Sequence, residues 1–219
     1  MHKNIIAEIN RSDRAFSSAV GRELCVRHGA SRMLPVRALQ ADAEATAALD
    51  RKSGIDFLLE RREGLISVAA RVNFSRRLYA SFTLRLRTGM DGLCELDKRL
   101  LAFLDPQQHL MKPALVVQAT VAPGGGNVCL GAFAVDHDDL ISAVIDPSNY
   151  NLWTLCYHPI DRTPFLSVWV KALRRLGVRV EDVVPPRTTP CHGIPGSHLV
   201  ELRYPTTCRQ VRALMPYIN

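Results

Sequence analysis

The feature that most constrains the fold is a pair of apolar segments separated by four residues. Residues 55–60 (IDFLLE) and 65–72 (LISVAARV) are rich in large or β-branched apolar side chains, and residues 61–64 (RREG) between them end in glycine. Apolar runs of this length bounded by turn residues are typical of buried strands. A four-residue loop that ends in glycine is compatible with a hairpin. The sequence therefore predicts a β-hairpin over residues 55–72.

Segments on both sides of the hairpin predict helices and further strands. Before it, apolar side chains at helical spacing predict a helix over residues 13–28, and the proline in residues 33–39 keeps that extended piece out of the centre of a sheet. Residues 41–50 are compatible with a short helix or a loop. The elements expected after the hairpin are strands over 80–86, 114–121 and 128–135 and helices over 93–104 and 138–145. This order predicts an α/β fold with a mixed central sheet flanked by helices.

The last third of the chain has a different texture, with frequent prolines from about residue 148 onward. Its expected elements are a helix over 164–176, a long loop over 184–196, a strand over 198–204 and a helix over 206–217. We therefore expect a core of residues 1–148. Residues 149–219 are expected to form a C-terminal α/β extension that packs on the core and offers a surface for protein partners.

The chain is basic, with a formal net charge of +7 and a sequence pI of about 9.3. Five of its 28 basic residues are lysines and the rest are arginines. A positive field attracts nucleic acid, and the planar guanidinium group suits phosphate oxygens. We expect DNA as the partner and leave RNA open. The alternative is a protein–protein scaffold whose arginines reflect a GC-rich genome.

The sequence also bears on the compartment. No stretch approaches the roughly 18 apolar residues that span a bilayer. Near the N-terminus, Glu8 follows Ile5 and Ile6 closely, so the apolar run of a signal peptide is missing. The six cysteines are scattered without a CxxC pair, which favours reduced thiols. We expect a cytoplasmic protein that does not associate with a membrane.

The predicted hairpin carries residues at positions that matter in metal-dependent nucleases. Such enzymes fix carboxylates close together on rigid strands, where they hold the Mg²⁺ that polarises a phosphate and activates water. Asp56 opens the first strand, and Ala69 and Arg71 project to one face of the second. This arrangement resembles the PD-(D/E)XK nuclease-like superfamily over residues 10–145. Asp56 stands in the place of the motif aspartate, Ala69 in that of the glutamate and Arg71 in that of the lysine.

The resemblance implies a Mg²⁺-dependent DNA endonuclease, and two positions depart from it. Ala69 cannot bind a metal, and Arg71 cannot be a general base because a guanidinium has a pKa above about 12. An active site therefore needs a second carboxylate. The nearest ones in sequence are Glu23, Glu44 and Glu60.

Two interpretations of the hairpin follow from these departures. In the first, Asp56, Arg71 and Glu23 are catalytic: Asp56 and Glu23 hold Mg²⁺, and Arg71 contacts the scissile phosphate. In the second, the core is catalytically inactive and binds or scaffolds DNA within a larger nucleoprotein complex, of a mobile element or a defence system. Asp56 and Arg71 would then form an ion pair where a metal would otherwise lie.

Basic residues outnumber acidic ones between residues 61 and 99. A loop with adjacent arginines can follow a phosphate backbone, whereas any single arginine is better explained as solvated surface charge, and the excess as a whole favours nucleic acid. Arg174, Arg175 and Arg179 form a second basic cluster. The residues expected to bind nucleic acid are Arg61, Arg62, Arg76, Arg77, Arg85 and Arg87.

Cysteine and histidine residues give a weaker pattern. Cys156 and His158, and Cys191 and His192 with later His and Cys residues, lack the paired short spacing that is usual for structural zinc. A nucleophilic Cys–His pair would need a third orienting residue, and the spacing identifies none. We therefore keep the hairpin as the predicted site.

Overall fold

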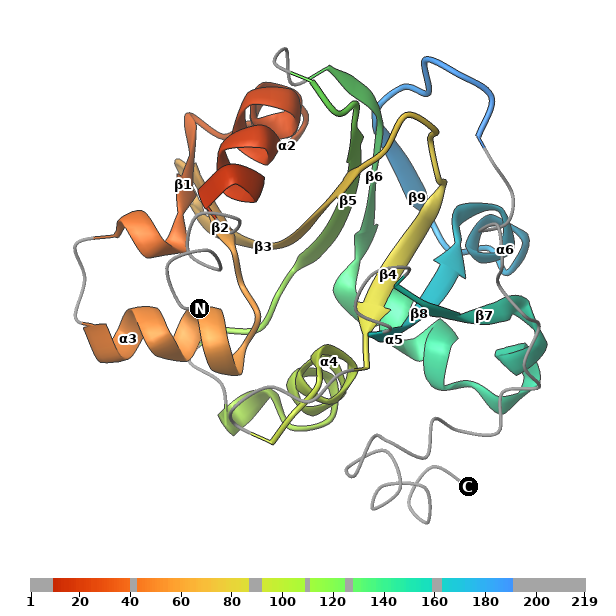
Figure 1. Ribbon diagram of the computed structural model, residues 1–219. Coiled ribbons are helices and arrows are strands. Elements are labelled where there is room, and N and C mark those ends of the chain that lie inside the picture. Colours follow the sequence, from red (N-terminus) through yellow and green to blue (C-terminus); the bar gives the residue numbers. More distant parts are fainter. Residues whose placement is uncertain are drawn as a thin grey trace.

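The structure, a computed structural model, describes residues 10–39, 43–86, 92–108, 111–124, 128–158 and 163–190. Within these ranges the strands form two sheets (Figure 1). The larger has six strands in the order β1-β2-β3-β5-β6-β9, and the smaller has three in the order β4-β8-β7. In the part of the chain that is described, no helix is both long and apolar enough to cross a bilayer.

The six-stranded sheet is mixed. β3 and β5 are parallel, and every other neighbouring pair is antiparallel. The predicted hairpin is confirmed as β2 and β3, and the predicted mixed sheet flanked by helices is confirmed as well. The strands of this sheet are β1 (Arg32–Pro35), β2 (Phe57–Arg61), β3 (Gly64–Phe74), β5 (Leu115–Val121), β6 (Cys129–Asp136) and β9 (Val180–Val184).

The smaller sheet combines strands from distant parts of the sequence. β4 (Ser81–Arg85) pairs with β8 (Pro164–Trp169), which pairs with β7 (Trp153–Tyr157). The strand expected over residues 80–86 is therefore present, but it lies in this second sheet. Strands from both sides of residue 148 are paired in both sheets, and the division of the chain at that residue stays a prediction.

The helices lie close to their predicted positions in the first two thirds of the chain. Residues 10–16 are α-helical and continue through a π-helical turn into α2, which ends at Gly29 with φ 62°. A left-handed glycine is a common way to end a helix. The helical elements are η1 (Ser17–Gly21), α2 (Arg22–His28), η2 (Val36–Ala38), α3 (Ala43–Ala47), η3 (Ala48–Lys52), α4 (Glu95–Leu104), η4 (Pro106–Gln108), α5 (His137–Ile145), η5 (Pro147–Leu152) and α6 (Val170–Arg175).

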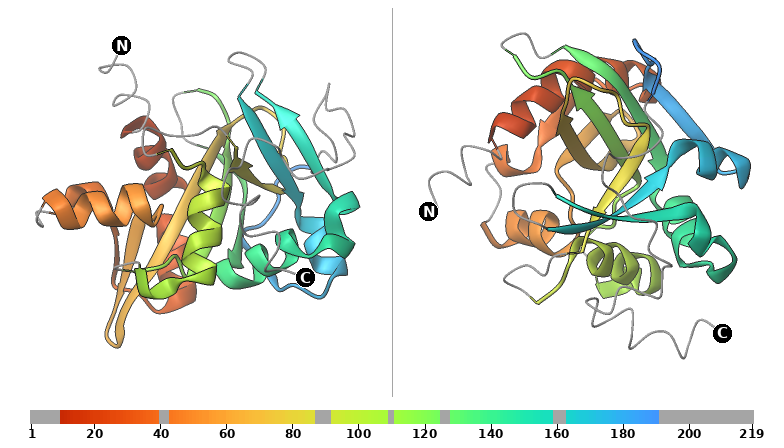
Figure 2. Two further views of the ribbon diagram at one scale, coloured as in Figure 1. Left: turned by 90° about the horizontal axis from the view of Figure 1, so that it is seen from below. Right: turned by 45° about the vertical axis from the view of Figure 1, so that its right-hand side comes forward.

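The larger sheet is buried on both faces (Figures 1 and 2). Successive side chains of β3 show this, because Val68 and Ala70 pack against the N-terminal helix while Ala69 packs on the opposite side. The N-terminal helix contributes Phe16, Val20 and Leu24 to the first core. The second core lies between the larger sheet and a layer formed by α4, α5, α6 and the smaller sheet.

One prediction in the last third of the chain is corrected, and two strands there were not predicted. The helix expected over residues 164–176 is wrong in its first half, because residues 164–169 form β8 between β4 and β7. Phe165, Val168 and Trp169 are residue types that favour strands, and the helix begins after them at Val170. The strands β7 and β9 were not predicted. The strand expected over 198–204 and the helix expected over 206–217 lie outside the described residues.

We expect Phe16→Ala to lower the free energy of unfolding by about 3–5 kcal/mol, because it removes a large buried side chain from the core under the N-terminal helix. Phe16 is 1% exposed, and its ring stacks on that of Phe57 with 5.0 Å between centroids. Urea denaturation measures the change. Val26→Ala on the same helix is the control, because Val26 is 70% exposed. Equal effects of the two substitutions would contradict this account of the core.

Candidate functional site

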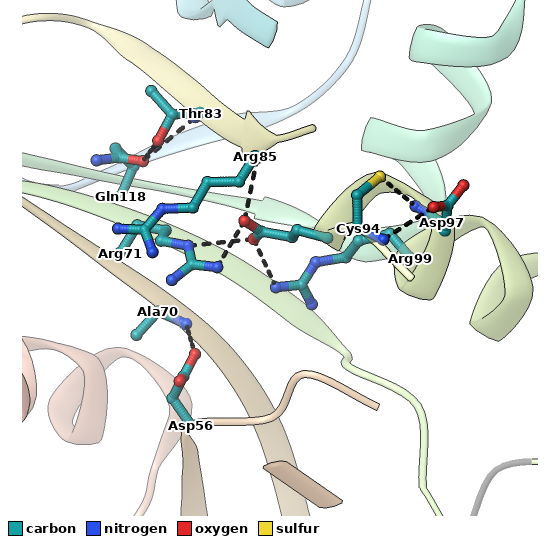
Figure 3. Close-up of polar contacts among 10 residues, drawn as sticks. Asp56, Ala70, Arg71, Thr83, Arg85, Cys94, Asp97, Arg99 and Gln118 are labelled. Carbon is teal, nitrogen blue, oxygen red and sulfur yellow. Dashed lines mark hydrogen bonds and ion pairs between the residues drawn. The ribbon is translucent and has the colours of Figure 1, made fainter. Parts of the chain in front are cut away.

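The predicted motif positions meet where β2 and β3 separate. β2 begins at Phe57 opposite Val68, whereas β3 continues along β5 as far as Phe74. Just before β2, the Asp56 backbone N–H donates to the Val68 carbonyl at 2.9 Å. The Asp56 Oδ2 accepts the N–H of Ala70 at 2.8 Å (Figure 3). The carboxylate of Asp56 therefore lies beside positions 69 to 71 of β3.

The carboxylate that binds Arg71 comes from a helix instead of the hairpin. Arg71 donates from Nε and Nη2 to Oε1 and Oε2 of Glu95, at 3.2 and 2.5 Å. Glu95 also accepts from Nη2 of Arg99 at 3.3 Å, one turn further along α4. We call these residues the Arg71–Glu95–Arg99 network (Figure 3). Arg71 is thus paired with Glu95, and Asp56 is a nearby charge that is not its direct partner.

The start of α4 is fixed by a reciprocal cap. The Cys94 Sγ accepts the N–H of Asp97 at 3.4 Å, and the Asp97 carboxylate accepts the N–H of Cys94 at 2.9 Å. Such a capping box satisfies two of the free N–H groups at a helix start. Because Glu95 is the first residue of α4, this cap also fixes the position of the Glu95 backbone.

Side chains of the larger sheet and of α4 also bind the edge of the smaller sheet. β4 is an edge strand, and its Arg85 N–H donates to Oε2 of Glu95 at 3.2 Å. Its Thr83 donates from both the backbone N–H and the hydroxyl to Oε1 of Gln118, at 3.3 and 3.0 Å. Gln118 lies opposite Arg71 on β5. The N–H groups of Thr83 and Arg85, which among the described residues have no strand partner on this edge of β4, are thus hydrogen-bonded by side chains. The bond from Thr83 to Gln118 also joins the two sheets.

Burial and the two arginines set the ionisation of this site. Burial raises the pKa of Asp56 to about 6, although the charges of Arg71 and Arg99 act in the opposite direction. For Glu95, burial also favours the neutral acid, but the two guanidinium groups lower its pKa to about 2. Burial lowers the pKa of Arg99, which is 2% exposed. Near neutral pH the site therefore holds two cations and two anions in a small, largely buried volume.

These residues do not fit a Mg²⁺ site as they are arranged. Among the described residues, no group of three or more His, Cys, Asp or Glu side chains is placed to hold a metal ion. Glu95 is occupied by two guanidinium groups, and Ala69 offers no oxygen. A divalent cation prefers several oxygen ligands, and here Arg71 and Arg99 would repel it.

The acidic residues expected from the sequence to assist Asp56 lie elsewhere. Glu23 is exposed on α2, whose apolar side packs on the other face of the sheet. Glu44 is exposed on α3, and Glu60 forms an ion pair with Arg32. The carboxylate that does act on Asp56 through its charge is Asp50. The structure thus brings Asp56 and Arg71 close together and leaves Glu23 apart from them.

The six arginines expected to bind nucleic acid are distributed over separate places. Arg61 and Arg62 lie at the β2–β3 turn, whereas Arg76 and Arg77 follow the far end of β3. An 11-residue strand is roughly 33 Å long, so these pairs are far apart. Arg85 is the exposed last residue of β4. Arg87 lies outside the described residues.

The second basic cluster and the cysteines add no further site among the described residues. Arg174 pairs with Asp182, and Arg179 pairs with Glu181. Cys156 is buried, and burial raises its pKa to about 11, so its thiol is a poor nucleophile at neutral pH. His158 directly follows β7, whereas Cys191, His192, His198 and Cys208 lie outside the described residues.

Sequence reasoning missed three residues of the site, Glu95, Arg99 and Gln118. A signal for the first two was present, because a glutamate and an arginine four residues apart adjoin the leucines at 96 and 100 of the predicted helix. Opposite charges beside an apolar stripe can mark a buried ion pair. Gln118, a single polar residue in an apolar strand, gave no comparable signal.

Comparison with known proteins gave no match to a protein-family model, to a curated protein or to a solved structure.

We expect Glu95→Ala to lower the free energy of unfolding by about 3–5 kcal/mol, because removing one partner leaves buried charges uncompensated. Arg71, Arg99 and the Arg85 N–H would each lose an acceptor. The measurement is urea denaturation at neutral pH. The control is Glu181→Ala, whose partner Arg179 is 85% exposed, and it should cost less than about 1 kcal/mol. A similarly small cost for Glu95→Ala would contradict the structural importance of the network.

Asp56→Asn should change how stability depends on pH. The pKa of Asp56 is raised from 3.8 to about 6, so the folded chain favours the protonated acid. The stability that this group contributes is present below pH 3.8 and is lost as the pH rises through about 6. Asparagine imitates the protonated acid and can still accept the Ala70 N–H. Relative to the unchanged protein, the variant should gain about 1–3 kcal/mol over this range.

Urea denaturation across this pH range measures the Asp56→Asn effect. Asp139→Asn, at an exposed carboxylate in the first turn of α5, is the control for the loss of an acidic group. A variant that loses stability relative to the unchanged protein as the pH rises would show that the Asp56 carboxylate is held by its arginines more strongly than burial opposes it.

Proposed function

We propose that this protein binds nucleic acid, with DNA as the first candidate, through a PD-(D/E)XK-like core that no longer cleaves it. The observation that carries the proposal is the kind of side chain around Asp56. Arg71 and Arg99 lie near it, position 69 is alanine, and Glu95 neutralises the two arginines. The two guanidinium groups would repel a divalent cation and Ala69 offers it no oxygen, which supports a core that does not cleave.

The arrangement of the hairpin supports the PD-(D/E)XK part of the proposal. Asp56 precedes the first strand and is hydrogen-bonded to β3 between the two remaining motif positions, Ala69 and Arg71. The side chain of Arg71 is 30% exposed although Glu95 holds its guanidinium group. Glu95 accepts from Nε and Nη2, and the N–H groups of Nη1 are the donors that would meet a phosphate oxygen.

The charge distribution supports the nucleic-acid part. The net charge is +7, and among the described residues several exposed arginines have no acidic partner. Arg62, Arg76 and Arg77 are of this kind, whereas Arg32, Arg37, Arg174 and Arg179 are paired. When an unpaired arginine contacts a phosphate, a cation condensed on the nucleic acid is released, and this release favours binding.

A Mg²⁺-dependent endodeoxyribonuclease is the second candidate, and Glu95 is the observation that favours it. Glu95 is a second carboxylate that acts on the same two arginines as Asp56. If Arg71 released it, Asp56 and Glu95 would be the residues to hold the metal. Mg²⁺ would then polarise the phosphate and activate water.

The cytoplasm remains the proposed compartment. The four cysteines in the described part of the chain are free thiols, which agrees with a reducing environment. RNA remains an alternative nucleic acid. We also retain the proposal that residues 149–219 contact protein partners in a larger nucleoprotein complex.

The proposed function is tested by fluorescence anisotropy with labelled single-stranded and duplex DNA over a range of salt concentrations. Binding should weaken steeply as salt rises, because phosphate contacts release counterions. Arg76→Ala with Arg77→Ala should weaken binding and reduce the slope of log K against log salt by about 1.5, since two contacts are lost. Arg174→Ala with Arg179→Ala is the charge-matched control, because both arginines are already paired.

The same DNA incubated with Mg²⁺ or Mn²⁺, and with a chelator, separates the two candidates. The proposal expects salt-sensitive binding without cleavage. Cleavage that needs metal, Asp56 and Glu95 would replace it with the nuclease. Binding that is weak and insensitive to salt would reject both and favour the protein–protein scaffold.

A further inference from the structure

The turn after β3 carries two arginines that lie apart from Asp56 and Glu95. Phe74 is the last residue of β3, and the next residue, Ser75, is held by its N–H on the Val121 carbonyl at 3.0 Å. The Ser75 hydroxyl accepts the N–H of Arg77 at 3.0 Å, which fixes the turn. Arg76 and Arg77 are exposed and have no acidic partner among the described residues. Two arginines are therefore presented on a turn with a defined conformation.

An arginine from the N-terminal helix covers the aromatic ring at the same place. The Arg11 guanidinium carbon lies 4.7 Å from the centroid of the Phe74 ring. Arg11 is exposed and, like Arg76 and Arg77, has no acidic partner in the described part of the chain. We call this pair the Arg11–Phe74 platform. It combines a planar cation with an aromatic ring, and Phe74 precedes the two arginines of the turn by two and three residues in the chain.

β2 does not extend along the end of β3. β2 begins opposite Val68, and beyond Ala70 the described part of β3 is paired with β5 alone. Val72 and Phe74 are partly exposed in this stretch. From Arg71 to Phe74 the strand rises about 10 Å, a span that a few nucleotides can cover.

We propose that the Arg11–Phe74 platform and the turn at Arg76 and Arg77 form a binding surface for single-stranded nucleic acid. An unpaired base stacks on the Arg11 guanidinium, and the phosphates on either side of it contact Arg76 and Arg77. This inference rests on the proposed function and adds to it the strandedness of the ligand and the place where it binds.

The chemistry of the surface favours a single strand over a duplex. In a duplex the base faces are stacked on one another, so a planar guanidinium finds only phosphates and groove edges. In a single strand each base has a free face that stacks on an aromatic ring or a guanidinium plane. The contact with the Phe74 ring restricts the Arg11 side chain before binding, which reduces the entropy lost on binding.

Arg11→Lys is the variant that tests stacking, because it keeps the charge and removes the plane. The probes are a short oligothymidylate and a duplex of the same length, each labelled for fluorescence anisotropy. The substitution should weaken binding of the single strand by at least about 5-fold, as expected for the loss of one stacked base, and should leave the salt dependence unchanged. Duplex binding should change little.

Arg22→Lys on the same helix is the matched control, because Arg22 is also exposed. Both substitutions are at exposed positions and should leave the urea midpoint unchanged, so a loss of binding is not a loss of folding. Phe74→Leu is a second variant that removes the support beneath Arg11, and it should reproduce the Arg11→Lys defect for the single strand.

The outcomes separate this inference from the proposed function. An unchanged affinity of Arg11→Lys for the single strand, or tighter binding of the duplex by the unchanged protein, would overturn the inference while nucleic-acid binding stands. If neither probe binds in a salt-sensitive way, the proposed function itself fails.

Discussion

The two sheets of this protein are joined at the carboxylate of Glu95. It receives two hydrogen bonds from Arg71 on β3, one from Arg99 on its own helix and one from the backbone of β4. A buried carboxylate is costly to desolvate, and here the attraction of two guanidinium groups exceeds that cost, which is why its pKa is lowered to about 2.

The Arg71–Glu95–Arg99 network determines the environment of the Asp56 carboxylate. Because Glu95 holds Arg71, the Asp56 carboxylate accepts, among the described residues, one hydrogen bond from the Ala70 N–H, and two arginines act on it as neighbouring charges. Burial then outweighs the attraction of the arginines, and the pKa of Asp56 rises. The two carboxylates of the site thus have pKa values displaced in opposite directions by the same pair of cations. In a nuclease such groups would share a metal, whereas here they share guanidinium groups.

The proposed function follows from where positive charge is left unpaired. Arginines inside the site and along the edges of the sheet are mostly neutralised by carboxylates. Within the described ranges, Arg76 and Arg77 after the end of β3 have no acidic partner, and Arg11 lies over the ring of Phe74, the last residue of β3. β2 does not extend along this part of β3. A surface with these properties can bind phosphates and a base without help from the motif. The proposed binding surface at the end of β3 is therefore separate from the site around Asp56.

The sequence by itself determined the local elements whose signals are short in range. The hairpin, the N-terminal helix with its glycine stop, the helix over residues 93–104 and the proximity of Asp56 to Arg71 all follow from periodicity and turn residues. Tertiary structure alone decided which strands pair and which charged side chains form ion pairs. Residues 164–169 became a strand because β4 and β7 lie on either side of them, and Glu95 reached Arg71 because α4 packs over β3. Both depend on contacts between residues far apart in the chain, and a periodic pattern in one segment carries no information about which distant segment will satisfy its hydrogen bonds or charges.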